Sequence, residues 1–207
     1  MMSGPSRFPR PARLLYRNAI FRVNEGGKKV YLTFDDGPTP GFTSEIISVL
    51  KQNNVHKAVF FCTGSNILKY PGEAQEIRRN KYSLANHGYI HMDGWKSKRR
   101  EYIDNCLKGA QISDSLFFRP PYGRITATQH VALRKKMRIV FWDLLFGDYD
   151  TRADAGLMMK KAKKMIRPGS VPVLHDKGNR VTLELLVSLI NHCRSQGYTF
   201  GDVTQDT

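Results

Sequence analysis

Short runs of β-branched and aromatic residues alternate with helix-like segments along most of the chain, and this alternation restricts the fold more than any other feature. Strand-like runs occur at 30–34, 58–62, 83–86, 116–118, 138–142, 171–174 and 198–200. Helical patterns occur between them at 43–53, 71–80, 97–112, 127–136, 152–166 and 181–196. About seven strands alternating with about six helices predict an α/β fold with a largely parallel sheet and helices outside it, either open and doubly wound or closed as a barrel.

Polar residues follow many of these strands at the point where each strand ends. They are Asp35 and Asp36, His87, Arg119, Asp143 and His175. The carboxyl ends of parallel strands meet on one face, where the sites of barrels and open α/β sheets form. Chance could place one or two such residues there, but five strand ends predict a functional cluster.

A pair of histidines, His87 and His91, lies four residues apart. This spacing brings both imidazoles to one point in either a helical turn or a tight loop, and Asn86, Gly88 and Gly94 favour a loop. Gly88 stands where a zincin protease needs its glutamate, so that class is excluded. Taken alone, the pair is as typical of surface or packed residues as of metal ligands.

Two adjacent carboxylates, Asp35 and Asp36, precede Gly37 and Pro38. Adjacent residues leaving a strand point in different directions, so one carboxylate can bind a cation while the other faces a water molecule. The alternative is a turn at a helix entry, because Asp, Gly and Pro are common turn residues.

Five segments resemble, in order, the five motifs of the NodB-type polysaccharide deacetylases, carbohydrate esterase family 4. They are Thr33 to Pro38, His87 to His91, Arg119 to Gly123, Trp142 to Asp148, and Leu174-His175. The first and third are highly specific. The resemblance runs from about Lys29 to the C-terminus and implies a single-domain distorted (β/α) barrel of about seven parallel strands. It also implies removal of acetyl groups from the amino sugars of a polysaccharide or peptidoglycan-type glycan.

The same resemblance implies a divalent metal bound by Asp36, His87 and His91. Zinc is the first choice, with cobalt, nickel or iron as alternatives. Two imidazoles, one carboxylate and open positions are typical of catalytic rather than structural zinc sites. Such a metal polarises an amide carbonyl and activates water.

Catalytic roles also carry over by position. The resemblance makes Asp35 the general base, held in place and kept ionised by Arg119. The backbone N–H of Tyr122 would help to bind the oxyanion, and His175, oriented by Asp148, would be the general acid. An acid is needed because an amine leaves poorly until it is protonated.

Trp142 would form a wall of the pocket. The chain departs from the family at Gly88, where Ser or Thr is usual, and at Tyr149, where many members have Trp. The first departure removes a hydroxyl that stabilises the loop, but it removes no metal ligand.

The chain is strongly basic, with 33 Lys and Arg against 18 Asp and Glu and a formal net charge of +15. This charge favours an anionic partner such as a cell-wall polymer or a membrane surface. The basic residues are scattered and match no nucleic-acid-binding motif, so no specific nucleic-acid partner is expected. Solvated helix faces explain most of them.

Residues 1–28 are expected to form a basic N-terminal arm before a catalytic domain at 29–207. The arm mixes arginines with apolar residues but lacks the continuous apolar core of a signal peptide. It could contact anionic lipid or pack against the domain. Cys62, Cys106 and Cys193 have no metal or redox spacing and are expected to be free thiols. These features favour a cytoplasmic or membrane-peripheral location.

Two other functions fit the same motifs. One is deacylation of a lipid-linked sugar or a small non-sugar amide, for which the basic charge suits a phosphate-bearing carrier. The other is a catalytically weak carbohydrate-binding relative. The second is disfavoured because an inactive relative tends to lose its metal ligands first, and this chain retains Asp35, Asp36, His87, His91, Arg119 and His175.

Overall fold

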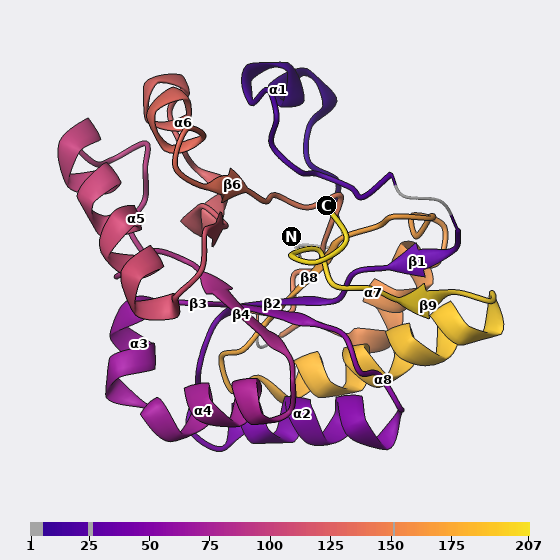
Figure 1. Ribbon diagram of the computed structural model, residues 1–207. Coiled ribbons are helices and arrows are strands. Elements are labelled where there is room, and N and C mark those ends of the chain that lie inside the picture. Colours follow the sequence, from indigo (N-terminus) through magenta and orange to yellow (C-terminus); the bar gives the residue numbers. More distant parts are fainter. Residues whose placement is uncertain (1–5, 25–26, 151) are drawn as a thin grey trace.

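Seven parallel strands form the main sheet in the computed structural model, which describes residues 6–24, 27–150 and 152–207. Their order across the sheet is β6-β5-β4-β3-β2-β8-β7 (Figure 1). The strands are β2 (Thr33–Asp36), β3 (Val59–Cys62), β4 (Ser83–Asn86), β5 (Phe117–Phe118), β6 (Arg138–Ile139), β7 (Leu144–Leu145) and β8 (Pro172–His175). The predicted α/β fold with a parallel sheet is confirmed.

The sheet curls because its two edge strands follow one another in the chain. Only residues 140–143 connect β6 to β7, and a fully extended connection of this length spans at most roughly 18 Å. The edges of a flat seven-stranded sheet would lie farther apart, since neighbouring strands are about 4.8 Å apart. The sheet is therefore a distorted (β/α) barrel, as the motifs predict.

The N-terminal arm lies along both edges of the curled sheet. The Ile20 N–H donates to the Ile139 carbonyl at 2.8 Å, and the Phe141 N–H donates to the Ile20 carbonyl at 2.7 Å. At the other edge, Ser6 and Leu145 exchange two backbone hydrogen bonds of 2.8 and 2.9 Å. The arm thus pairs with the barrel instead of extending from it.

Helices surround the sheet (Figure 1). They are α1 (Arg10–Leu15), α2 (Phe42–Gln52), α3 (Gly64–Lys69), α4 (Pro71–Arg79), α5 (Arg99–Ser113), α6 (Ala127–Leu133), α7 (Ala155–Ala162) and α8 (Arg180–Ser195), with a 3₁₀ turn, η1 (Pro121–Gly123). Side-chain caps fix several starts: Thr126 forms a capping box with Gln129 before α6, and Asp154 accepts from the Leu157 N–H at α7. Within these ranges, no helix is long and apolar enough to cross a membrane.

One of the expected strands is split and another is shorter than predicted. The run at 30–34 divides into β1 (Lys29–Val30) and β2, and β1 pairs in parallel with β9 (Thr199–Phe200) in a separate small sheet. The run at 138–142 ends at Ile139, and its continuation carries the chain across to β7. In both cases the strand ends where its backbone pairing with a distant segment ends. Such pairing leaves no pattern in the local sequence.

The largest buried cluster lies between the sheet and the apolar faces of α2, α4, α7 and α8. A second cluster contains aromatic residues of the arm, Phe8, Tyr16 and Phe21, packed against Phe141 and Trp142. The three cysteines are buried and free, as their spacing predicts.

Candidate active site

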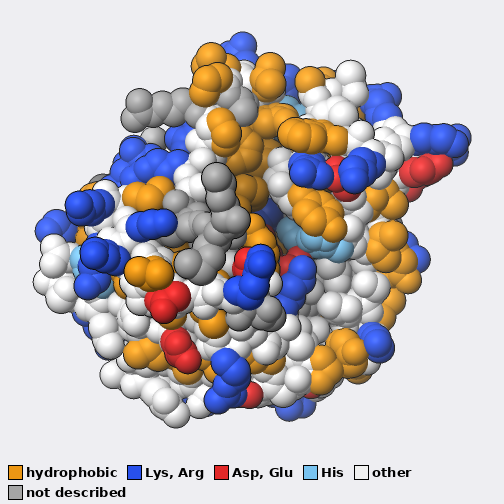
Figure 2. All heavy atoms as spheres, turned by 180° about the vertical axis from the view of Figure 1, so that it is seen from behind, with side chains coloured by type: hydrophobic (Ala, Val, Ile, Leu, Met, Phe, Trp, Pro, Cys, Tyr) orange, Lys and Arg blue, Asp and Glu red, His pale blue; other side chains and the backbone are white. Residues whose placement is uncertain are grey.

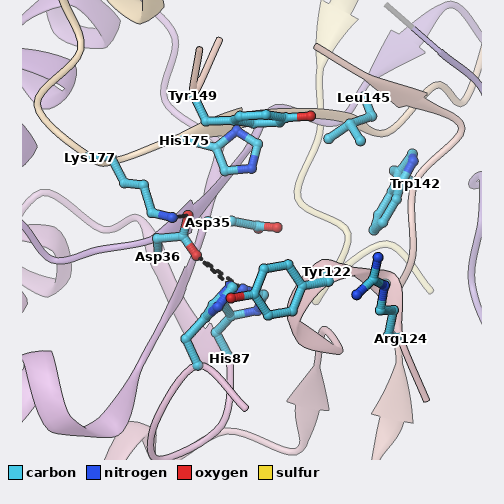
Figure 3. A pocket seen from close by; sticks show the side chains of 12 residues that line it. Asp35, Asp36, His87, Tyr122, Arg124, Trp142, Leu145, Tyr149, His175 and Lys177 are labelled. Carbon is cyan, nitrogen blue, oxygen red and sulfur yellow. Dashed lines mark ion pairs between the residues drawn. The ribbon is translucent and has the colours of Figure 1, made fainter. Parts of the chain in front are cut away.

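The C-terminal ends of the strands surround a cavity of about 450 Å³. Figure 3 shows its side chains pointing toward a common centre. The cavity opens on the face shown in Figure 2, where histidine side chains lie beside a hollow with hydrophobic groups along its rim. It is lined by Asp35, Asp36, His87, His91, Tyr122, Gly123, Arg124, Trp142, Leu145, Tyr149, His175 and Lys177.

Three side chains in the cavity form a candidate metal site: Asp36, His87 and His91. Their ligand atoms all lie within 4.8 Å of one another. The Oδ1 atom of Asp36 lies 2.9 Å from Nε2 of His91 and 3.4 Å from Nε2 of His87. Nδ1 of His87 lies 2.8 Å from the carbonyl of Arg119, which accepts its proton. That bond fixes the tautomer and leaves Nε2 with a lone pair for a metal.

The charge state of Asp36 suits a cation. Burial opposes its ionisation, but the imidazoles of His87 and His91 hold the pKa of its carboxyl well below the usual value. Both carboxylate oxygens are buried: Oδ1 faces the two imidazoles, and Oδ2 lies 2.9 Å from Nζ of Lys177. An ionised carboxylate beside two imidazole nitrogens is a donor set that suits zinc.

Gly88 is required by the loop that carries both histidines. Its φ is +83°, and a Cβ there would lie 2.7 Å from Nδ2 of Asn105. Two amide side chains hold the loop instead of a hydroxyl. Asn86 accepts from the Gly88 N–H at 2.7 Å, and Asn105 bonds both the N–H and the carbonyl of Ile90. The departure from Ser or Thr at this position is thus matched by a different set of loop contacts.

Arg119 is fully buried and holds Asp35. It donates to Oδ1 of Asp35 at 2.7 Å, to Thr33 Oγ1 at 2.8 Å and to the Phe141 carbonyl at 3.0 Å. Its guanidinium also stacks 4.1 Å from the Phe61 ring centroid. Burial lowers the pKa of Arg119, an effect that Asp35 opposes. The buried guanidinium thus fixes the position of the Asp35 carboxyl in the cavity.

His175 and Asp148 form a second pair on another side of the cavity. Nδ1 of His175 lies 2.8 Å from Oδ1 of Asp148, and Oδ2 accepts from the His175 N–H and from Thr182 Oγ1. Burial would lower the pKa of His175, but the bond to Asp148 and the nearby carboxylates raise it above its usual value. Its Nε2 is therefore suited to give a proton to a group in the cavity.

Tyr122 and Trp142 enclose the remaining sides. The Tyr122 ring meets the His91 ring edge-on, with centroids 4.3 Å apart. Trp142 is only 8% exposed and belongs to the aromatic cluster of the arm. Gly123, with φ +65°, lies so close that a Cβ there would be 2.3 Å from the indole ring. A glycine is thus needed where the η1 turn passes the indole.

This chain shares its sequence pattern with a known family. The family model for polysaccharide deacetylase matches residues 22–140. The chain belongs to the polysaccharide deacetylase family. This confirms the resemblance carried by the five motifs.

Other members of the polysaccharide deacetylase family are similar over most of this chain. The peptidoglycan-N-acetylglucosamine deacetylase PgdA of Listeria monocytogenes is 30% identical over 84% of the chain, which spans 37% of that protein. A peptidoglycan-N-acetylglucosamine deacetylase of Bacillus cereus is 33% identical over 83% of the chain and 66% of its own length. The crystal structure of the Bc1960 peptidoglycan N-acetylglucosamine deacetylase superposes with a TM-score of 0.87, at 27% identity and 96% coverage of each chain.

One residue expected in the site lies elsewhere. Asp143 does not line the cavity but is buried behind it, where it accepts from Arg7 at 3.0 Å, Arg167 at 3.2 Å and Ser170 at 3.1 Å. Successive residues of an extended segment point to opposite sides, so the neighbour of an inward-facing Trp142 must point outward. The prediction that Asp143 joins the cluster is therefore wrong.

Sequence reasoning also missed three residues of the cavity: Arg124, Leu145 and Lys177. Nζ of Lys177 lies 2.9 Å from Oδ2 of Asp36, the oxygen that turns away from the histidines (Figure 3). Lys177 stands two positions after His175 and Arg124 two after Tyr122. For Arg124 and Lys177 the signal was therefore the loop that directly follows a motif, whereas Leu145 lies within the motif from Trp142 to Asp148.

Proposed function

We propose that this protein is a metal-dependent deacetylase that hydrolyses the N-acetyl amide of an amino sugar in a polysaccharide or peptidoglycan-type glycan. The proposal rests on one cavity that brings three groups together. Asp35, held by Arg119, and His175, held by Asp148, lie on either side of the candidate metal site. That site consists of Asp36, His87 and His91. The Listeria and Bacillus relatives, which are peptidoglycan-N-acetylglucosamine deacetylases, support the substrate class.

A divalent metal, for which we propose zinc, would be held by Asp36, His87 and His91 and would supply polarisation of the amide carbonyl. Asp35 then accepts the proton of the attacking water. Arg119 holds that carboxyl in place by its 2.7 Å hydrogen bond, so Asp35 is positioned to act as a base.

Breaking the C–N bond requires a proton on the departing nitrogen. His175 donates it, and Asp148 stabilises the imidazolium beforehand through the 2.8 Å bond to Nδ1. Figure 3 shows His175 and His87 on opposite sides of the two aspartates. Base and acid thus act from different elements, β2 and β8, on one bond between them. The products are acetate and a free amino sugar.

The apolar wall of the cavity suits a small acyl group. Trp142 and Leu145 lie together on the side away from Lys177 (Figure 3). An acetyl methyl seated there would lose its contact with water, a gain of about 25 cal/mol for each Å² of apolar surface buried.

The proposal is tested by assaying acetate release from N-acetylglucosamine oligomers and peptidoglycan, with zinc supplied and then removed by a chelator. We expect release that depends on the metal and is lost in the His87→Ala, His91→Ala double variant. His56→Ala, an exposed histidine outside the cavity, is the matched control. Metal content equal to the parent's in the double variant would overturn the metal site, and activity only on lipid-linked sugars or non-sugar amides would overturn the substrate class.

A further inference from the structure

Trp95 is a large aromatic side chain that the fold leaves 61% exposed. It is one of two tryptophans in the chain, and the other, Trp142, is buried in the wall of the cavity. Trp95 lies four residues after His91, on the loop that follows the histidine pair. Tryptophan is strongly buried on average, so an indole held open beside a cavity needs an explanation.

The exposed indole is held in place. Its Nε1–H donates to the Ile125 carbonyl at 3.2 Å, and the Trp95 backbone N–H donates to Oδ1 of Asp93 at 3.0 Å. The Arg124 guanidinium lies over the ring, 5.2 Å from its centroid. Anchors on the ring nitrogen, the backbone and the ring face leave the indole little freedom to turn inward. A ring held in this way loses little conformational entropy when it binds a partner.

The indole is continuous with the cavity through Arg124. This arginine lines the cavity and lies 5.7 Å from the Tyr122 ring centroid as well. Asp93 fixes it, with Oδ2 only 2.6 Å from Nη1. Tyr122, itself 59% exposed, meets His91 at the candidate metal site. Tyr122, Arg124 and Trp95 thus form a shelf that leads from the metal site outward, and Figure 3 shows its inner part with Tyr122 beside Arg124.

We propose that this shelf is a second sugar-binding subsite, in which Trp95 stacks against a sugar unit next to the one being deacetylated. The inference rests on the proposed function and narrows its substrate class to oligomeric or polymeric glycans. The C–H groups on one face of a pyranose are apolar and slightly positive, which suits the negative face of an indole. Arg124 and Asp93 add donors and an acceptor for the hydroxyls at the edge of the same ring.

The rigid loop has a purely structural explanation as well. The Asp93–Arg124 pair would order this segment with any residue at position 95, so anchoring alone does not require a ligand. A structural role and a subsite differ in one measurable way. A subsite makes the effect of replacing Trp95 depend on substrate length, whereas a structural role damages all substrates alike.

The test compares Trp95→Ala, Trp95→Phe and the parent, all loaded with zinc, on N-acetylglucosamine substrates from the monosaccharide to the hexasaccharide. We expect Trp95→Ala to lower kcat/KM by about tenfold on the longer oligomers, as for a stacked aromatic at a binding centre, and to leave the monosaccharide unchanged. Trp95→Phe should retain most of the activity. Leu116→Ala is the matched control, because this exposed leucine precedes β5 at the opposite end of the sheet.

A binding measurement separates failure of this inference from failure of the proposed function. Titration of the parent with the hexasaccharide should change tryptophan emission, and Trp95→Phe, which retains only Trp142, should lose most of that change. Equal losses on all substrate lengths, or an unchanged emission response in Trp95→Phe, would overturn the subsite while the deacetylase activity stands. Absence of both turnover and binding with every glycan would overturn the proposed function and the subsite together.

Discussion

Asp35 lies beside the candidate metal ligands without belonging to them, and its partner is Arg119. Replacing Asp35 by Asn removes a proton acceptor but keeps an oxygen that can accept from Arg119. We therefore expect Asp35→Asn to retain the parent's metal content and to lose ~10²–10⁴-fold in kcat.

Metal analysis and turnover measured on the same preparations check this expectation. Asp104→Asn, an exposed carboxylate on α5, is the matched control and should behave as the parent. Near-parental turnover in Asp35→Asn would remove this carboxylate from the role of base.

Asp148 should determine how far activity extends toward alkaline pH. Burial lowers the pKa of His175, and the bond to Asp148 and the surrounding carboxylates raise it to a net value above the usual one. A raised pKa keeps the imidazolium, the form that can donate a proton, present to higher pH. Asp148→Asn removes the charge, so the pKa should fall and the alkaline limb of kcat should move to lower pH.

The full pH profile of kcat measures this shift. Asp150→Asn provides the comparison, because this carboxylate pairs with Arg152 at the surface and does not line the cavity. An alkaline limb that stays in place in Asp148→Asn would mean that His175 is not the acid whose ionisation limits the reaction.

At the scale of elements, helix α5 supports the histidine loop through close contact with Gly109. A Cβ on Gly109 would lie 2.3 Å from Oδ1 of Asn86 and 2.5 Å from the carbonyl carbon of Gly88. Asn86 is the last residue of β4, and Gly88 lies in the loop that carries His87 and His91. Gly109→Ala should therefore push the loop off the helix, lower the free energy of unfolding by about 1–3 kcal/mol and weaken zinc binding.

Thermal unfolding and zinc titration of the variant check both effects. Gly72→Ala in α4 is the matched control, since its Cβ would meet nothing within 4 Å and alanine favours a helix. Unchanged zinc affinity in Gly109→Ala would show that the loop keeps its geometry without α5.

Local pattern predicted most elements of this fold, including the helices α2, α4, α5 and α8 to within about two residues. It missed α3 (Gly64–Lys69), which starts directly after β3. This helix is only six residues long, too short to show a helical period. Its first two N–H groups bond the carbonyls of Gly88 and Tyr89, so contact with the histidine loop determines its position.

At the scale of the whole molecule, the N-terminal arm completes the barrel wall behind the cavity. Phe8 is buried against Phe141 and Trp142, with ring centroids 4.7 and 5.4 Å away. Phe8→Ala should cost about 3–5 kcal/mol of stability because it leaves a void among these rings. It should also raise KM, since Trp142 loses the support that holds it in the pocket.

Denaturant unfolding and steady-state kinetics of the variant test this dependence. Leu14→Ala on the same arm is the control, because that side chain is 81% exposed and its loss should change neither property. A free energy of unfolding equal to the parent's in Phe8→Ala would show that packing of the arm does not stabilise the barrel.

The sequence by itself determined the parallel sheet, the family, and the residues that end the strands, because strand and helix periods and motif spacing are local properties. Only the tertiary structure decided that Asp143 points away from the cavity to meet Arg7 and Arg167, and that Lys177 reaches Asp36. The tertiary structure alone also showed that the N-terminal arm pairs with both edges of the sheet. Each of these depends on the direction in which a side chain or backbone group points after the sheet has curled. That direction is set by pairing between segments far apart in the chain, which leaves no periodic pattern to read.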